Sequence, residues 1–139
     1  MNEDKLSILQ FLGYRVANFN LIENSTYTGE EDNIDIRFQS NIIKKPESEE
    51  DFFILLGCKV EENEKNRKNA QFYFNLDILG HFRFVEKTET SESFYKNALA
   101  ILFPYLRSFL STVSSQSGFR PVILPICNIN KILDNKNNS

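Results

Sequence analysis

The chain has 139 residues, enough for one hydrophobic core and short for two ordinary domains. A net charge of −3 gives it no general attraction for nucleic acid or anionic lipid. Its first five residues are mostly polar and acidic, and no uninterrupted apolar run approaches the roughly 18 residues of a membrane span, so we expect neither a secretory signal nor membrane insertion. We therefore expect a cytoplasmic protein in which Cys58 and Cys127 are reduced thiols.

The aromatic content is high for a single small core. The chain has 13 Phe and 5 Tyr residues but no Trp. One small core can bury many of these rings, and the surplus indicates an apolar surface kept for a partner or for subunit contact.

The N-terminal third predicts a short helix followed by two strands. Apolar residues over 4–12 have helical spacing and stop at Gly13, which predicts a short N-terminal helix within residues 1–13. Residues 14–22 predict a strand with a bulge near Ala17 and Asn18, where the apolar alternation changes phase. Residues 34–42 alternate apolar and polar side chains, which predicts a half-buried strand.

The middle of the chain predicts two more strands. Residues 52–60 and 70–84 each have apolar side chains at every second position, and Gly80 inside the later run predicts a second bulge. We expect the charged residues 61–69 to form a hairpin loop. Because these connections are too short for a crossover helix, the four strands should form an antiparallel sheet.

The last third predicts a long helix and then an apolar loop. The helix should begin after the capping residues 90–93, reach about Ser115 and stop at Gly118, with a kink at Pro104. Residues 119–128 are apolar but contain two prolines, which favours an extended loop lying on another surface. Residues 131–139 are polar and predict a disordered tail. The fold class is therefore α+β, one domain over residues 1–139, with a long helix on one face of a four-stranded antiparallel sheet.

Catalytic and metal-binding patterns are weak. His81 is the only histidine, and neither it nor the two widely spaced cysteines form a zinc or acid–base constellation. The five glycines form no phosphate-binding loop, so we expect no ATP hydrolysis and no cofactor. The acidic clusters at residues 30–32 and 47–51 lack the spacing of a calcium loop and are better read as solvated loops.

Two linked motifs carry a family resemblance. Residues 101–105 read ILFPY, and Phe119, Leu124 and Asn128 follow with the spacing F-x4-L-x3-N. Together they resemble the SecB family of protein-export chaperones, in which ILFPY lies on the long helix and the second motif forms a crossover loop. Residues 72–74 and 80–82 also resemble the third and fourth strands of that family.

The resemblance implies a fold, an assembly and a binding site. The implied fold is the sheet and helix predicted above, assembled as a dimer of dimers with the long helices at the tetramer interface. That assembly accounts for the second apolar face of the helix, formed by Ile101, Tyr105 and Phe109. The crossover loop and the neighbouring sheet are implied to form a groove for unfolded clients. The candidate client-binding residues are Phe72, Tyr73, Phe74, Phe119, Val122, Leu124 and Ile126.

One feature of the family is changed in this sequence. In the family, acidic residues on the first and third strands help dock the export motor ATPase SecA. The matching positions here are Asn18 and Asn75, so this contact is not expected from the sequence.

Three hypotheses follow. The first is an ATP-independent chaperone that holds unfolded or extended polypeptides, possibly for protein export. The second is a dedicated module on the same fold that serves one partner, such as the antitoxin of a toxin–antitoxin system. The third, an enzyme, lacks a catalytic constellation in the sequence.

Overall fold

A computed structural model describes residues 9–29, 33–44, 47–48, 50–85, 91–122 and 124 of the chain. Within these residues the chain forms four strands and two helices. In order they are β1 (Leu9–Glu23), β2 (Arg37–Lys44), β3 (Asp51–Val60), α1 (Glu64–Asn69), β4 (Phe72–Phe84) and α2 (Ser91–Gln116).

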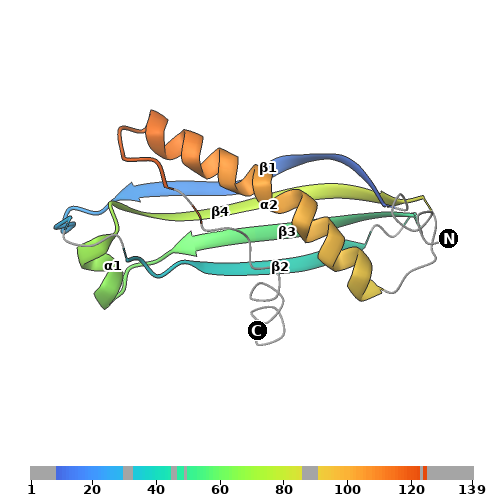
Figure 1. The fold of residues 1–139 in the computed structure, drawn as a ribbon, viewed down its shortest axis with the longest axis horizontal. Coiled ribbons are helices and arrows are strands. Elements are labelled where there is room, and N and C mark those ends of the chain that lie inside the picture. The colour runs from blue at the N-terminus through green and yellow to red at the C-terminus, as the bar shows by residue number, and fades with distance from the viewer. Residues whose placement is uncertain are drawn as a thin grey trace.

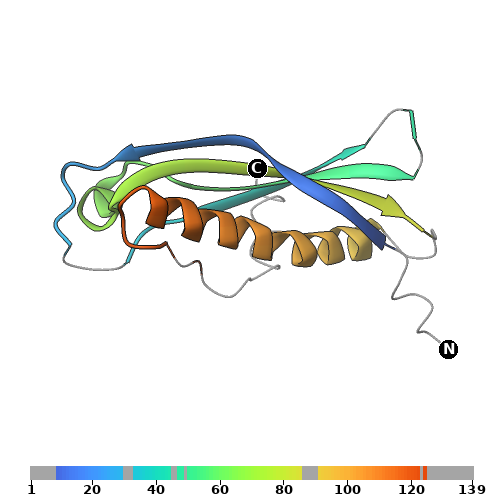
Figure 2. The ribbon, with the colours of Figure 1, turned by 90° about the horizontal axis from the view of Figure 1, so that it is seen from above.

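The strands form one antiparallel sheet in the order β1-β4-β3-β2. The long helix α2 lies diagonally across one face of this sheet (Figures 1 and 2). On β4 the side chains alternate between buried and half-buried positions from Phe72 to Phe82, as expected where one face of a sheet is covered more than the other. The predicted α+β class, with four antiparallel strands and one long helix, is confirmed.

The contact between α2 and the sheet is apolar. Leu99, Leu102, Leu106 and Leu110 recur every three or four residues and are fully buried. By length and composition Phe94–Gln116 could also cross a membrane, yet in this fold it is a core helix. Only 39% of its most apolar window is buried within the chain. The predicted end of the helix is confirmed, because Gly118 follows it with a φ of +90°.

The predicted N-terminal helix is wrong over its last residues. Residues 9–12 belong to β1, which continues through Gly13, and residues 1–8 lie outside the described part of the chain. Two irregularities in the β1–β4 pairing explain the error. One lies between Phe11 and Gly13 and the other between Val16 and Asn18, and each shifts the apolar alternation by one residue. The second confirms the bulge predicted near Ala17.

Two predictions for residues 61–84 are also corrected. Residues 61–69 contain the short helix α1, not only a loop. Gly80 is no bulge, since it pairs in register with Tyr14 and Ile54 within the single continuous strand β4. Its lack of a side chain makes room for the helix, because a Cβ there would lie 2.8 Å from Cδ1 of Leu102. Residues 72–74 and 80–82 are therefore parts of one strand.

Candidate functional site

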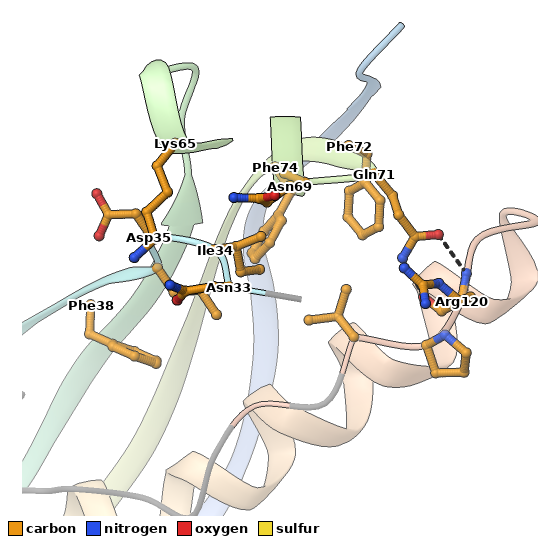
Figure 3. A pocket seen from close by; sticks show the side chains of 14 residues that line it. Asn33, Ile34, Asp35, Phe38, Lys65, Asn69, Gln71, Phe72, Phe74 and Arg120 are labelled. Atoms are coloured by element: carbon orange, nitrogen blue, oxygen red, sulfur yellow. Dashed lines mark hydrogen bonds between the residues drawn. The ribbon is translucent and has the colours of Figure 1, made fainter. Parts of the chain in front are cut away.

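A groove of about 680 Å³ lies on the helix-bearing side of the sheet, next to α1 (Figure 3). It is bounded by the segment leading into β2, the start of β4 and the loop that follows α2. Its apolar lining consists of Ile34, Ile36, Phe38, Ala70, Phe72, Phe74, Pro121 and Val122. Polar residues complete it: Asn33, Asp35, Lys65, Asn69, Gln71 and Arg120.

The floor and the walls of the groove differ in accessibility. Phe72 and Phe74 are each only 3% exposed and form the floor, with their ring centroids 5.7 Å apart. The wall residues Ile34, Ile36 and Val122 are half-buried. A molecule in the groove would therefore meet mostly the wall side chains.

The wall before β2 is positioned by a buried asparagine. Asn66 in α1 is fully buried, and its side chain bonds both backbone groups of Asp35. The Asp35 N–H donates to Oδ1 of Asn66 at 2.7 Å, and Nδ2 of Asn66 donates to the Asp35 carbonyl at 3.1 Å. These bonds replace pairing with β3, so β2 begins at Arg37 and not at Ile34 as predicted.

Helix α1 is itself held by asparagine side chains. Oδ1 of Asn63 accepts from the Asn66 N–H at 2.8 Å and caps the first turn. Nδ2 of Asn24, at the end of β1, donates to the carbonyls of Asn66, Arg67 and Ala70 at 3.2, 3.0 and 2.7 Å. A six-residue helix is too short to be stable alone, so these hydrogen bonds stabilise α1 and fix its position beside the end of β1.

The wall after α2 is also anchored by side chains. The Val122 N–H donates to Oγ of Ser114 at 2.9 Å. The amide of Gln71 bonds both backbone groups of Arg120: the N–H donates to Oε1 at 2.9 Å, and Nε2 donates to the carbonyl at 3.3 Å (Figure 3). The Arg120 guanidinium also contacts the Tyr27 hydroxyl. The groove is thus formed by two irregular segments held in fixed positions.

The groove has little net charge. Asp35, Lys65 and Arg120 are the ionisable residues in its lining, and the Asp35 carboxylate accepts from Nδ2 of Asn63 at 3.2 Å. With both signs at the rim and apolar side chains inside, this surface suits apolar ligands of varied sequence.

The structure places the predicted client-binding residues in different environments. Phe72, Phe74 and Val122 line the groove. Phe119 packs against the Phe72 ring at 4.7 Å, beside the floor and outside the lining. Ile126 lies outside the described residues.

Two of these residues do not line the groove. Tyr73 lies on the opposite sheet face, because neighbouring residues of a strand point to opposite sides. Leu124 is 1% exposed in the core and is a packing residue. The sequence analysis did not include Ile34, Ile36 and Phe38 in the groove, although their alternation with polar residues predicted that they share one face.

The predicted interface residues on α2 face β1. The Tyr105 ring contacts those of Phe11 and Tyr14 at 5.3 and 4.9 Å, and Phe109 meets Phe19 edge-on at 5.3 Å. Ile101 is half-buried. Tyr105 nevertheless stays 39% exposed, and Tyr14 and Val16 on the same face of β1 are each 38% exposed. An exposed apolar strip therefore follows the junction of α2 and β1.

An ionic cluster lies on the opposite face of the sheet. Asp51 accepts from Nε of Arg83 at 2.7 Å and from Nε2 of His81 at 3.1 Å. The bond from Arg83 is the main cause that lowers the pKa of Asp51 to about 2. His81 also stacks on Phe53 at 4.6 Å and is not part of the groove. Within the described ranges, no group of three His, Cys, Asp or Glu side chains could hold a metal ion.

A family model described as preprotein translocase subunit SecB matches residues 16–139. The chain belongs to the SecB family. A solved structure of similar fold is the SecB-like chaperone Rv1957 of Mycobacterium tuberculosis, in complex with a ChAD peptide from the HigA1 antitoxin. It has a TM-score of 0.67 at 13% identity, over 89% of this chain and 94% of that one. At this identity the likeness to Rv1957 shows the fold.

Two further relatives extend the comparison. The uncharacterized protein MJ0357 of Methanocaldococcus jannaschii is 29% identical over 132 residues, which cover 91% of this chain and 83% of the relative. A protein of unknown function from Streptococcus agalactiae has a TM-score of 0.52 at 15% identity, over 85% of this chain and 97% of that one. SecB family membership supports a chaperone-like role in binding polypeptide.

Proposed function

We propose that this protein is an ATP-independent chaperone that holds unfolded or extended polypeptides in the groove between residues 33–38 and 120–122. The observation that carries this proposal is a preformed apolar groove on a SecB-family fold. Burial of one apolar client side chain contributes about 1–3 kcal/mol, and ordering a flexible client offsets much of it. Holding of this kind needs neither nucleotide nor a catalytic step.

Several weak sites acting together would give useful affinity. Self-association along the exposed strip of Tyr14, Val16 and Tyr105 would place several grooves in one assembly. Once one groove holds a client, the high effective concentration of the others would raise the overall affinity even though each single contact is weak. The dimer of dimers predicted from the sequence, with Ile101, Tyr105 and Phe109 near the interface, is part of this proposal. A cytoplasmic location is part of it as well.

Protein export is a narrower form of the proposal. The family description supports a role in export. The sheet face away from α2, however, lacks the acidic residues through which the family docks SecA. Asn18 donates to Oδ2 of Asp77 at 3.5 Å, and Asn75 pairs with Lys59, which in turn pairs with Arg37. Because Asn18 and Asn75 are uncharged where the family has acidic residues, we propose client holding without delivery to SecA through acidic contacts at these two positions.

A dedicated module for one partner is the second candidate. The antitoxin peptide bound to Rv1957 favours it, because that protein has the same fold. The two candidates differ in client breadth. A general chaperone should suppress aggregation of several unrelated denatured proteins at similar molar ratios, and a dedicated module should act on one partner.

The proposal is tested by light scattering of chemically denatured, unrelated proteins diluted into the wild-type protein or a variant. Val122→Asp places a charge in the groove, and Ile22→Asp places the same charge on the opposite sheet face, where Ile22 is 63% exposed. We expect wild type and Ile22→Asp to suppress aggregation, and Val122→Asp to lose most of this activity.

Circular dichroism and solution mass check that both variants keep the fold and assembly of the wild type. A wild-type protein that leaves every denatured substrate to aggregate would remove the general chaperone reading. Equal activity of the two variants would place the client surface elsewhere.

A further inference from the structure

Phe119 lies beside the groove without lining it. The three residues that follow it, Arg120, Pro121 and Val122, form one wall of the groove. The Phe119 ring instead packs against the ring of Phe72, with the two centroids 4.7 Å apart and the planes tilted by 39°. Phe72 belongs to the floor of the groove and is 3% exposed. The Phe119 ring is therefore one of the groups that cover this floor residue.

The backbone of Phe119 is fixed by the end of α2. The Gly118 N–H donates to the Ser115 carbonyl at 3.2 Å, and the Phe119 N–H donates to the Ser114 carbonyl at 3.0 Å. With Gly118 at a φ of +90°, these two bonds form a Schellman motif, which ends many helices. The ring can thus change its position by rotation about the side-chain torsions, while the backbone stays where it is.

Phe119 is less tightly enclosed than the floor rings. Phe72 and Phe74 are each 3% exposed and belong to β4, whereas Phe119 is half-buried on the irregular segment after α2. Rotation of a half-buried ring toward solvent exposes less new apolar surface than rotation of a buried one. Compared with Phe74, whose ring also contacts Phe72, Phe119 can leave that contact at a lower cost in free energy.

We propose that Phe119 is a specificity-determining residue: its ring holds the place of an aromatic client side chain and must rotate away before such a side chain packs on Phe72. This inference rests on the proposed function of the groove. The occupant is a phenylalanine or tyrosine side chain of an unfolded client, because the Phe119 ring itself shows that an aromatic ring fits against Phe72. Branched aliphatic side chains bind along the walls, at Ile36 and Val122, and need no such rotation.

The closed position of Phe119 lowers the affinity for aromatic clients. A client ring packs on Phe72 only in molecules whose Phe119 ring has rotated away, so the apparent Kd equals the intrinsic Kd divided by the fraction of such molecules. Removing the Phe119 ring removes this penalty. Its truncation should therefore strengthen the binding of aromatic clients, whereas truncation of the wall residue Val122 should weaken the binding of every client.

Peptide affinities of the full chain and its variants test the proposal. Two labelled peptides of alternating leucine and threonine differ only in one central residue, phenylalanine in one and leucine in the other. In fluorescence anisotropy we expect Phe119→Ala to bind the phenylalanine peptide about five- to tenfold more tightly than the wild type does, and the leucine peptide within about twofold of it. Val122→Ala should bind both peptides more weakly.

Phe53→Ala is the matched control for the loss of a half-buried ring. Phe53 stacks on His81 at 4.6 Å on the opposite face of the sheet, so this variant should bind both peptides as the wild type does. A second readout needs no variant to fold. In the NMR spectrum of the wild type with labelled phenylalanine rings, the Phe119 signals should shift strongly with the phenylalanine peptide and little with the leucine peptide.

Failure of this inference differs from failure of the proposed function. If the wild type binds both peptides but Phe119→Ala binds the phenylalanine peptide more weakly, Phe119 is part of the binding surface and the inference is wrong. Unchanged affinity for both peptides, with the circular dichroism of the wild type, would also overturn it. If the wild type binds neither peptide, or if Val122→Ala binds both as tightly as the wild type, the groove is not the client site and the proposed function fails with the inference.

Discussion

The helix-bearing face of the sheet has two halves that differ in what covers them. Under α2, Ile54, Leu56 and Phe82 have no exposed surface. At the other end, beyond the helix, apolar residues such as Ile34 and Ile36 remain half-buried around the groove. Both halves have the apolar composition of a core. The diagonal path of α2 therefore separates a packed part of this face from the part that holds the proposed client groove (Figure 1).

The two halves also differ in how the backbone is held. The covered half is a regular ladder with leucines packed on it. Around the groove, side chains such as Asn66, Gln71 and Ser114 bond the backbone of irregular segments instead. A preformed apolar surface can stay uncovered only when something other than packing fixes its walls.

The largest effect on stability is expected in the covered half. Leu106→Ala removes a fully buried side chain between α2 and the sheet. We expect a loss of about 3 kcal/mol in the free energy of unfolding, measured by urea denaturation, because a cavity remains. Client affinity per folded molecule should stay at the wild-type value. A large loss of affinity under folding conditions would mean that the two halves are not separate.

A smaller loss is expected from the clamp at α1. Asn66→Ala leaves partly buried backbone groups of Asp35 and Glu61 without the partner that Asn66 provides. We expect about 2 kcal/mol of destabilisation together with weaker client binding, because residues 33–36 lose their position. Denaturation and fluorescence anisotropy of a labelled unfolded peptide measure the two effects. Destabilisation with unchanged peptide affinity would count against a binding role for this segment.

Truncation inside the groove should affect binding more than stability. Ile36→Ala removes half-buried atoms of the wall, so we expect less than about 1 kcal/mol of destabilisation and roughly five- to tenfold weaker peptide binding. Ile22→Ala, on the opposite face, is the matched control and should bind as the wild type does. The same anisotropy assay compares the two variants, and an equal loss in both would argue against the groove.

The smallest effect is expected from acid. The pKa of Asp51 is about 2 in the folded protein, below its ordinary value of 3.8. The contact of its carboxylate with Arg83 therefore stabilises the fold above pH 3.8, and this stabilisation is lost as the pH falls toward 2. Because the Arg83 side chain is 44% exposed and solvent screens the pair, its contribution is small. Asp51→Asn should show a shallower loss of stability over this interval in thermal melts. An unchanged slope would mean that other carboxylates dominate.

Local patterns predicted much of the fold. Residues 52–60 and 70–84 alternate without interruption, so β3 and β4 were predictable, as was α2 from its leucine stripe and Gly118. β1 was partly misread because two bulges reset its alternation. Helix α1 depends on Asn24, which lies about forty residues away in sequence, and no local pattern contains that contact.

The site was harder to predict than the fold. Alternation showed that Phe72, Phe74, Ile34 and Ile36 face inward, but which of them stay accessible depends on the path of α2 across the sheet. Leu124 and Phe119 were predicted to bind clients because the resemblance places both residues in the crossover loop. Leu124 is instead buried in the core, and Phe119 packs against Phe72.

The central claim is that clients lie in the groove that α2 leaves open. Photo-crosslinking from a reactive residue placed at position 122, compared with the same residue at position 22, tests it most directly with an unfolded client. The account predicts strong crosslinking from position 122 and only background from position 22. Equal crosslinking from both positions, or crosslinking from position 22 alone, would contradict it.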